Sequence, residues 1–190
     1  DSRDNLCKYL YAVLFDLMVV EVNKTLANTA PTVYNIGILD IFGFEVFDTN
    51  SLEQLCINYS NEKLQQHFNE IVFEKDMSLY RAEGVPTDKV DFVDNSACVQ
   101  LIEGKPLGIL NLLQEECSLG AATDTSFVTK VDKSFGDSAG ERTKKQSQYF
   151  IKNRREPLLF SVKHFAGAVE YSGTDFLEKS RSTLNDSLRA

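Results

Sequence analysis

The stretch that decides the fold runs from residue 36 to residue 45 and reads IGILDIFGFE. Residues 36–42 are nearly all apolar, a pattern typical of a strand that is covered on both faces in a parallel sheet. The only charge in that run is Asp40, and a carboxylate at the carboxyl end of such a strand lies where open α/β sheets bind ligands. Gly43 lets the backbone approach a ligand more closely than a β-carbon would allow. The stretch therefore predicts an α/β fold with a ligand site directly after a buried strand.

Helical patterns flank this stretch on both sides. A first apolar stripe, at steps of four and three, predicts a helix that packs on another surface; its members are Leu6, Leu10, Val13, Leu17 and Val20. A second helical pattern runs from about residue 50 to about residue 80, with a cap expected at residues 48–50 and Glu53 closing a capping box. Its stripe resumes after a step of five beyond Tyr59, so we expect this long helix to wrap around two neighbours or to bend.

The rest of the chain predicts a helical hairpin followed by two short strands. Pro106 suits an early position in the first helix of the hairpin, and Thr123 or Asp124 is expected to cap the second, which ends near Phe135. Residues 136–148 have the composition of a polar loop. The two strands are expected at residues 158–162 and 168–171, and a final helix at residues 176–188.

The composition is that of an ordinary folded protein. Of the 190 residues, 43% are hydrophobic, and no apolar run reaches the ~20 residues that a membrane span requires, so no membrane span is expected. The net charge of −8 argues against nucleic-acid binding. Basic residues are in excess between residues 130 and 156, which suits either an acidic partner or a solvated loop. The cysteines have no CxxC spacing, and His67 and His164 have no carboxylate or cysteine at ligand spacing, so no metal site is expected.

Several strings taken together resemble the myosin family over essentially the whole chain. LDIFGFE at residues 39–45 is similar to the family's switch II, and NYSNEKLQQHF at residues 58–68 is similar to its relay helix. PLGIL at residues 106–110, ATD at residues 122–124 and KHFAG at residues 163–167 follow downstream. The resemblance implies a mainly helical part of a P-loop NTPase-like motor, with one buried strand of the central sheet and a small pair of strands.

Switch II senses the nucleotide in myosins, and the resemblance implies three residue roles. Asp40 is expected near the Mg²⁺ of bound ATP, through water, as suits a hard cation that keeps part of its hydration shell. Gly43 is expected to present its backbone N–H to the γ-phosphate. Glu45 is expected to pair with an arginine of switch I and to help to position the attacking water. ATP and Mg²⁺ are thus the implied cofactors, bound mainly by segments that this chain lacks.

The resemblance also implies binding to filamentous actin. Apolar residues with lysines nearby suit a partner that is acidic and has an apolar centre. The implied actin-binding residues are Pro106, Leu107, Ile109, Leu110, Leu113, Thr123, Asp124, Phe127, Val128, Lys130, Lys144 and Lys145. The other implied partner is the remainder of the heavy chain, including its converter and its light-chain-binding neck, and the implied location is the cytoplasm, on the actin cytoskeleton.

The resemblance divides the chain into five regions. These are a helix leading to the sheet (1–33), a strand with switch II (34–48), the relay helix and relay loop (49–92), an actin-binding helix-loop-helix region (93–136), and a basic loop with short strands and a final helix (137–190). The chain has no tryptophan, and Thr87 stands where myosins commonly have one in the relay loop. We therefore expect the contact of this loop with the converter to differ.

The leading hypothesis is a segment of a motor ATPase that couples ATP hydrolysis to actin binding and force. The chain contains neither a GxxxxGK[ST] loop nor switch I, so the segment alone is not expected to hydrolyse ATP, and both its ends are expected to be cuts in a longer chain. The alternative is a non-catalytic actin-binding module, against which intact Asp40, Gly43 and Glu45 count. A kinase-like phosphotransferase is set aside, because Ile41 interrupts the likeness to DFG and no HRD loop precedes it.

Overall fold

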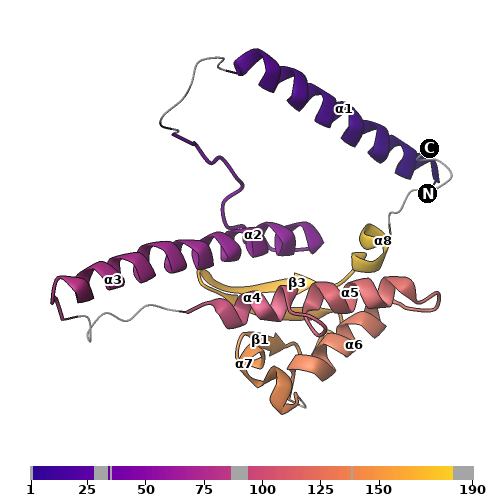
Figure 1. Cartoon of the computed structure of the whole chain (residues 1–190). Coiled ribbons are helices and arrows are strands. Elements are labelled where there is room, and N and C mark those ends of the chain that lie inside the picture. The colour runs from indigo at the N-terminus through magenta and orange to yellow at the C-terminus, as the bar shows by residue number, and fades with distance from the viewer. Residues whose placement is uncertain (1, 28–33, 35, 87–93, 138, 182–190) are drawn as a thin grey trace. The chain divides into compact units, whose positions relative to one another are not determined.

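The computed structural model describes residues 2–27, 34, 36–86, 94–137 and 139–181, and the chain forms two units (Figure 1). The first unit comprises residues 1–41 and 181–190, and the second comprises residues 42–180. Helix α1 (Ser2–Leu26) belongs to the first unit, and its apolar side chains are exposed, so the described part of that unit does not supply the expected packing surface. The sequence predicts a break in this helix at residues 28–32, because Pro31 cannot donate a backbone N–H, but these residues lie outside the described ones. Within the described ranges, no helix is long and apolar enough to cross a membrane.

The structure does not contain the strand that was expected at residues 36–42. These residues have no regular secondary structure, and the side chains of Ile36 and Ile38 are 97% and 94% exposed. A strand of a parallel sheet exists only where neighbouring strands take up its backbone hydrogen bonds. Among the described residues the strands form a single antiparallel sheet of three, which leaves residues 36–42 without a pairing partner. The prediction of a parallel-sheet strand at residues 36–42 is therefore wrong for this structure.

The long helix is present as three consecutive segments (Figure 1): α2 (Leu52–Phe68), a π-helical turn η1 (Asn69–Phe73) and α3 (Glu74–Ala82). A π-helical turn inserts an extra residue and rotates the helix face, which is the kind of irregularity that the phase change predicted, although it comes later than Tyr59. The cap is Ser51 rather than residues 48–50, and its backbone N–H donates to Gln54 Oε1 at 3.0 Å. Lys179 and Ser51 contact Glu53 and lower its pKa to about 2.

A small antiparallel sheet has the strand order β1 (Phe150–Lys152), β2 (Leu159–His164) and β3 (Gly167–Ser172). The expected pair of strands is confirmed as β2 and β3, whereas β1 was not expected. Side chains alternate across β2, so Phe160, Val162 and His164 are buried on one face. Gly167 closes the turn into β3 with a φ of +145°, which a residue with a β-carbon rarely adopts.

Short helices complete the second unit: α4 (Ser96–Glu103), α5 (Ile109–Ser118), α6 (Asp124–Phe135), η2 (Glu141–Thr143), α7 (Lys144–Ser147) and α8 (Phe176–Ser180). The expected hairpin is confirmed as α5 and α6, and Thr123 is the cap of α6, with its Oγ1 accepting from the Ser126 N–H at 3.1 Å. Pro106 lies in the turn before α5 rather than inside it. Of the expected final helix, only the part up to Arg181 falls within the described residues.

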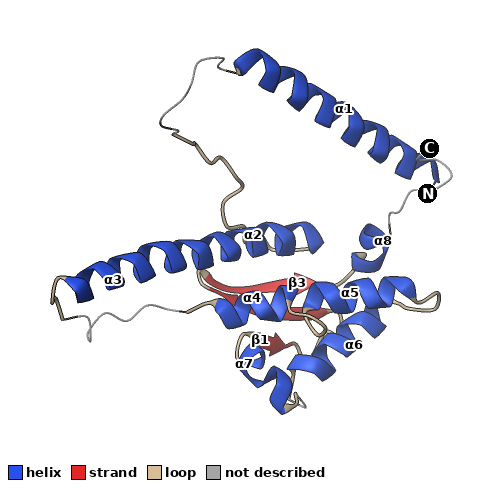
Figure 2. Ribbon diagram, in the orientation of Figure 1, coloured by secondary structure: helices blue, strands red, loops and turns tan. Residues whose placement is uncertain are grey.

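One hydrophobic core holds the second unit together. Helix α2 contacts β3, α4 contacts β2, and α5 contacts both α6 and α8 (Figure 2). The core draws on every one of these elements, and its members are Leu55, Cys98, Leu101, Ile102, Ile109, Leu112, Leu113, Phe127, Val128, Val131, Phe135, Phe150, Phe160, Val162, Val169, Tyr171, Phe176 and Leu177. The apolar stripes of α5 and α6 therefore face the interior of this unit.

Phe127 provides a direct test of this core. Its side chain is fully buried and its ring centroid lies 5.8 Å from that of Phe176 on α8. Phe127→Ala should lower the free energy of unfolding by about 3–5 kcal/mol, because it removes buried apolar surface and leaves a cavity. Urea denaturation followed by circular dichroism measures the change. Thr129→Ala, at an exposed position of the same helix, should change the free energy of unfolding by less than about 0.5 kcal/mol. Equal losses of stability in the two variants would place Phe127 outside the core.

Candidate functional site

The segment that joins residue 42 to residue 50 is held by a side chain of α2. The Glu45 N–H donates to Asn58 Oδ1 at 2.8 Å, and Asn58 Nδ2 donates to the Glu45 carbonyl, also at 2.8 Å. A side-chain amide has the same donor and acceptor as a peptide group, so Asn58 satisfies the backbone of Glu45 as a neighbouring strand would. Asn58 is completely buried. The position of Glu45 is therefore tied to the first half of the long helix.

Two further amides on the same face of α2 reach this segment. Gln54 Nε2 donates to Glu45 Oε2 at 3.3 Å, and Asn61 Nδ2 donates to the Phe42 carbonyl at 3.0 Å. Positions 54, 58 and 61 are separated by four and three residues, so helical geometry places all three on one face. The sequence reads as an ordinary polar helix here, but the structure gives this polar face a specific partner, the segment of residues 42–50.

The other end of the segment is fixed to the sheet by Asn50. Its Oδ1 accepts from the Phe47 N–H at 2.8 Å, and its Nδ2 donates to the carbonyls of Phe47 and Glu170 at 3.0 and 2.9 Å. The Asn50 carbonyl in turn accepts from the Ser172 N–H at 2.8 Å. Asn50 was expected to belong to a helix cap, but its side chain joins the segment to β3 instead.

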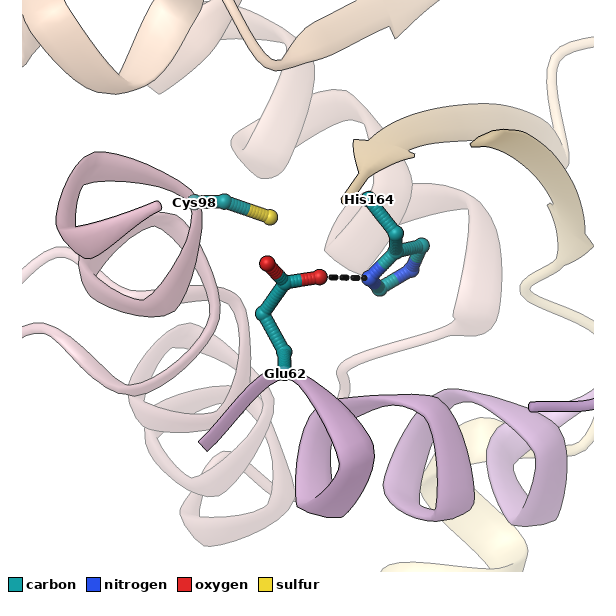
Figure 3. A group of neighbouring side chains, drawn as sticks. All are labelled: Glu62, Cys98 and His164. Atoms are coloured by element: carbon teal, nitrogen blue, oxygen red, sulfur yellow. Dashed lines mark hydrogen bonds and ion pairs between the residues drawn. The ribbon is translucent and has the colours of Figure 1, made fainter. Parts of the chain in front are cut away.

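One turn of helix beyond Asn58, Glu62 places a carboxylate in the interior of the unit (Figure 3). Its Oε2 accepts from His164 Nδ1 at 3.0 Å and from the Phe165 N–H at 3.1 Å, and its Oε1 accepts from Asn95 Nδ2 at 2.7 Å. The Cys98 thiol is a further hydrogen-bonding neighbour. A buried carboxylate is tolerated only where the protein supplies donors in place of water, and Glu62 has them from α4 and from the β2–β3 hairpin.

Glu62 and Asn58 are the two ends of one chain of hydrogen bonds. A carboxylate only accepts, so the proton shared with Glu62 lies on His164 Nδ1. In the tautomer protonated there, Nε2 accepts from the Tyr171 hydroxyl at 2.8 Å. The Tyr171 oxygen accepts from Asn58 Nδ2 at 2.9 Å. Burial raises the pKa of Tyr171, so the hydroxyl keeps the proton that it donates. Every member thus has a defined role as donor or acceptor.

Glu62, Cys98 and His164 bring oxygen, sulfur and nitrogen atoms within 4.8 Å of one another, a donor set that zinc also uses. Burial and the nearby Glu62 carboxylate raise the pKa of the Cys98 thiol, which opposes the thiolate that a metal requires. His164 Nδ1 and both Glu62 oxygens are already engaged with each other or with donors from Asn95 and Phe165. We therefore interpret the group as a hydrogen-bond network rather than a metal centre.

Sequence spacing does not reveal this network. His164 has no carboxylate or cysteine at ligand spacing along the chain, but Glu62, 102 residues away in sequence, lies only 3.0 Å away in space. The alternation of β2 could have indicated it, because a histidine at the buried positions shared by Phe160 and Val162 requires a hydrogen-bonding partner.

Comparison with known proteins decides the family. The family model for the myosin head (motor domain) matches residues 1–190. The chain belongs to the myosin head family. It is 45% identical to unconventional myosin-Vb of Mus musculus over 97% of its own length, and 42% identical to the myosin-I heavy chain of Dictyostelium discoideum over 99%. It is also 43% identical to myosin-3 of Arabidopsis thaliana over 97%.

This myosin head segment spans only a small share of those relatives. It covers 10% of the mouse protein, 8% of the Dictyostelium protein and 15% of the Arabidopsis protein. The likeness therefore concerns one part of a much longer chain in each relative.

The residues expected at the nucleotide are divided between the two units. Asp40 lies in the exposed segment of the first unit, whereas Gly43 and Glu45 belong to the second. A β-carbon built on Gly43 would meet nothing within 4 Å, so contacts within the described residues do not require a glycine at this position. The Glu45 carboxylate is half-buried and accepts from Gln54. Thr87 lies outside the described residues.

Among the residues expected to bind actin, four are core residues. Ile109, Leu113, Phe127 and Val128 are at most 4% exposed, so their side chains are not available to a partner in this structure. Periodicity alone could not reveal this, because an apolar stripe on a hairpin suits a partner protein and the chain's own interior equally. Leu107 and Leu110 are half-buried and pack against the same core.

The polar residues of that expected surface differ in their availability. The Asp124 carboxylate accepts from the backbone N–H groups of Asp175 and Leu177 at 2.8 and 3.1 Å, so it joins α6 to α8. Lys130 forms ion pairs with Glu115 and Glu116 at 2.9 and 3.0 Å. The remaining four residues of the set are exposed: Pro106, Thr123, Lys144 and Lys145.

Removing the carboxylate of Glu62 tests the network. Glu62→Ala should lower the free energy of unfolding by about 3–5 kcal/mol, because it leaves the donors of His164, Asn95 and Phe165 buried without their acceptor. Chemical denaturation measures this loss. Glu70→Ala, at an exposed position two turns further along the helix, should be close to neutral. A loss below about 1 kcal/mol for Glu62→Ala would contradict the interpretation of a structural network.

Proposed function

We propose that this chain is the part of an actin-based motor ATPase that senses the terminal phosphate of ATP and passes its presence on to an actin-binding surface. The observation that carries the proposal is the double hydrogen bond between Asn58 and the backbone of Glu45. Any displacement of Glu45 must move α2 or break both bonds. A sensing loop coupled to a long helix needs such a connection.

Residues 40–45 contain groups that suit the terminal phosphate and its metal ion. Gly43 has open space where a side chain would be, which allows its backbone N–H to approach a phosphate oxygen. Asp40 is an exposed carboxylate, the ligand type that Mg²⁺ prefers, and would hold the ion through water. Bound Mg²⁺ would neutralise phosphate charge. Glu45 would pair with an arginine from another part of the heavy chain and orient the attacking water.

Other segments of the heavy chain would bind the nucleotide and would form the force-producing parts. The chain contains no GxxxxGK[ST] loop, so we propose that it hydrolyses ATP only within the complete motor, together with a converter and a light-chain-binding neck. We propose the cytoplasmic actin cytoskeleton as its location. The alternative, a non-catalytic actin-binding module, is an outcome of the first test below.

The proposed actin contact rests on exposed residues of the second unit. Lys144 and Lys145 on α7 belong to the basic stretch, and Pro106 and Thr123 lie in exposed turns. The expected actin surface is acidic, and exposed lysines accelerate and stabilise association with an acidic surface. The four buried residues of the hairpin would support this surface from beneath rather than touch the filament.

Glu45→Ala tests the catalytic proposal in a complete motor domain that contains this chain. We expect actin-activated ATP turnover to fall by about 10²-fold or more while nucleotide binding persists, because the water would lose its positioning group. Steady-state phosphate release and fluorescent-nucleotide titration give the two readouts. Asp48→Ala, an exposed acid of the same segment, should retain turnover. Normal turnover of Glu45→Ala, or none in the wild type, would favour the non-catalytic module.

Charge reversal at α7 tests the actin surface. The double change Lys144→Glu and Lys145→Glu should weaken co-sedimentation with actin filaments by roughly threefold to tenfold at low salt, and the difference should shrink as salt screens the charges. Lys75→Glu, at an exposed position of α3, should bind as the wild type does. The surface would be wrong if the α7 variant bound actin normally at low salt.

A further inference from the structure

The amide of Asn58 has a third partner besides the two backbone atoms of Glu45. Its Nδ2 carries two hydrogens; one is donated to the Glu45 carbonyl at 2.8 Å and the other to the Tyr171 hydroxyl at 2.9 Å. The two hydrogen bonds to Glu45 do not by themselves fix the Asn58 amide, because the amide could move together with the segment. The bond to Tyr171 instead anchors the amide to β3, a separate element of the unit.

The Tyr171 hydroxyl is itself held in one direction. It donates to His164 Nε2 at 2.8 Å, and His164 presents that acceptor because its Nδ1 proton is directed at Glu62. Tyr171, His164, Asn58 and Glu62 are all buried, so water cannot replace a lost partner. Two of these residues come from α2 and two from the β2–β3 hairpin.

We infer that Tyr171 is a positioning residue for Glu45 and that the β2–β3 hairpin, together with α2, determines where the phosphate-sensing segment rests. The inference rests on the function proposed above. Asn58 holds Glu45 in the position that matches a terminal phosphate only while the Tyr171 hydroxyl holds Asn58. Loss of that hydroxyl leaves one Asn58 hydrogen and His164 Nε2 unpaired and lets the amide turn away from the segment.

The contacts of the Tyr171 ring allow the hydroxyl to be removed alone. The ring centroid lies 5.9 Å from those of both Phe160 and His164, and these contacts remain in Tyr171→Phe. Tyr149→Phe is the control, because Tyr149 is a half-buried tyrosine of this unit whose hydroxyl donates to the Asp94 carbonyl at 3.3 Å, outside the Asn58 chain.

The experiment compares two ligands in a complete motor domain that contains this chain. ADP alone reports nucleotide binding, and ADP with vanadate adds a mimic of the terminal phosphate. Tyr171→Phe should bind ADP as the wild type does but lose about tenfold in affinity for vanadate in the presence of ADP, with a parallel fall in kcat for ATP. Tyr149→Phe should match the wild type with both ligands.

A second variant keeps the test decisive if Tyr171→Phe does not fold. His164→Asn can still donate to Glu62 but is too short to offer an acceptor to Tyr171, so it should show the same selective loss toward vanadate. The inference is overturned if either folded variant binds vanadate within twofold of the wild type, even when its melting temperature falls, since the hydroxyl would then be structural only. Normal turnover of Glu45→Ala would instead overturn the proposed function itself.

Discussion

The buried carboxylate of Glu62 constrains how the elements of the second unit pack. The carboxylate of Glu62 is completely buried, and its stability depends on donors that the protein must bring to it. Those donors come from His164 and Phe165 in the β2–β3 hairpin and from Asn95 at the start of α4. Helix α2 can therefore pack only in the register that delivers Glu62 to them, which in turn places Asn58 beside Tyr171.

Polar and apolar groups have different roles in this arrangement. Apolar stripes of α5, α6 and α8 fill the core, and buried polar side chains of α2 hold the segment of residues 42–50 that precedes α2. Hydrogen bonds are directional, so they fix a backbone position more sharply than apolar contacts do. The proposed sensing role requires such a defined position, because the displacement of a single contact would have to be transmitted. The α5–α6 hairpin contributes the apolar core, and its turns and α7 are the parts proposed to contact actin.

The sequence predicted the elements whose determinants are local. The long helix, the hairpin capped by Thr123 and the strand pair around Gly167 each follow from periodicity, capping and turn residues. It failed for residues 36–42, whose apolar pattern needs strands that the described residues do not provide. The sequence could not show that Phe127 and Val128 are buried in the chain's own core, since an apolar stripe does not say what covers it. The partnership of His164 with Glu62 was out of reach, because nothing local links residues so far apart in sequence.

The Asn58 side chain holds the backbone of Glu45, and amide hydrogen exchange at Glu45 measures this directly. We expect this amide to exchange at least about 100-fold more slowly than in an unstructured peptide, and Asn58→Ala to remove the protection while the amides of β2 and β3 keep theirs. Exchange of the wild-type Glu45 amide at the rate of an unstructured peptide, or unchanged protection in Asn58→Ala, would contradict this expectation.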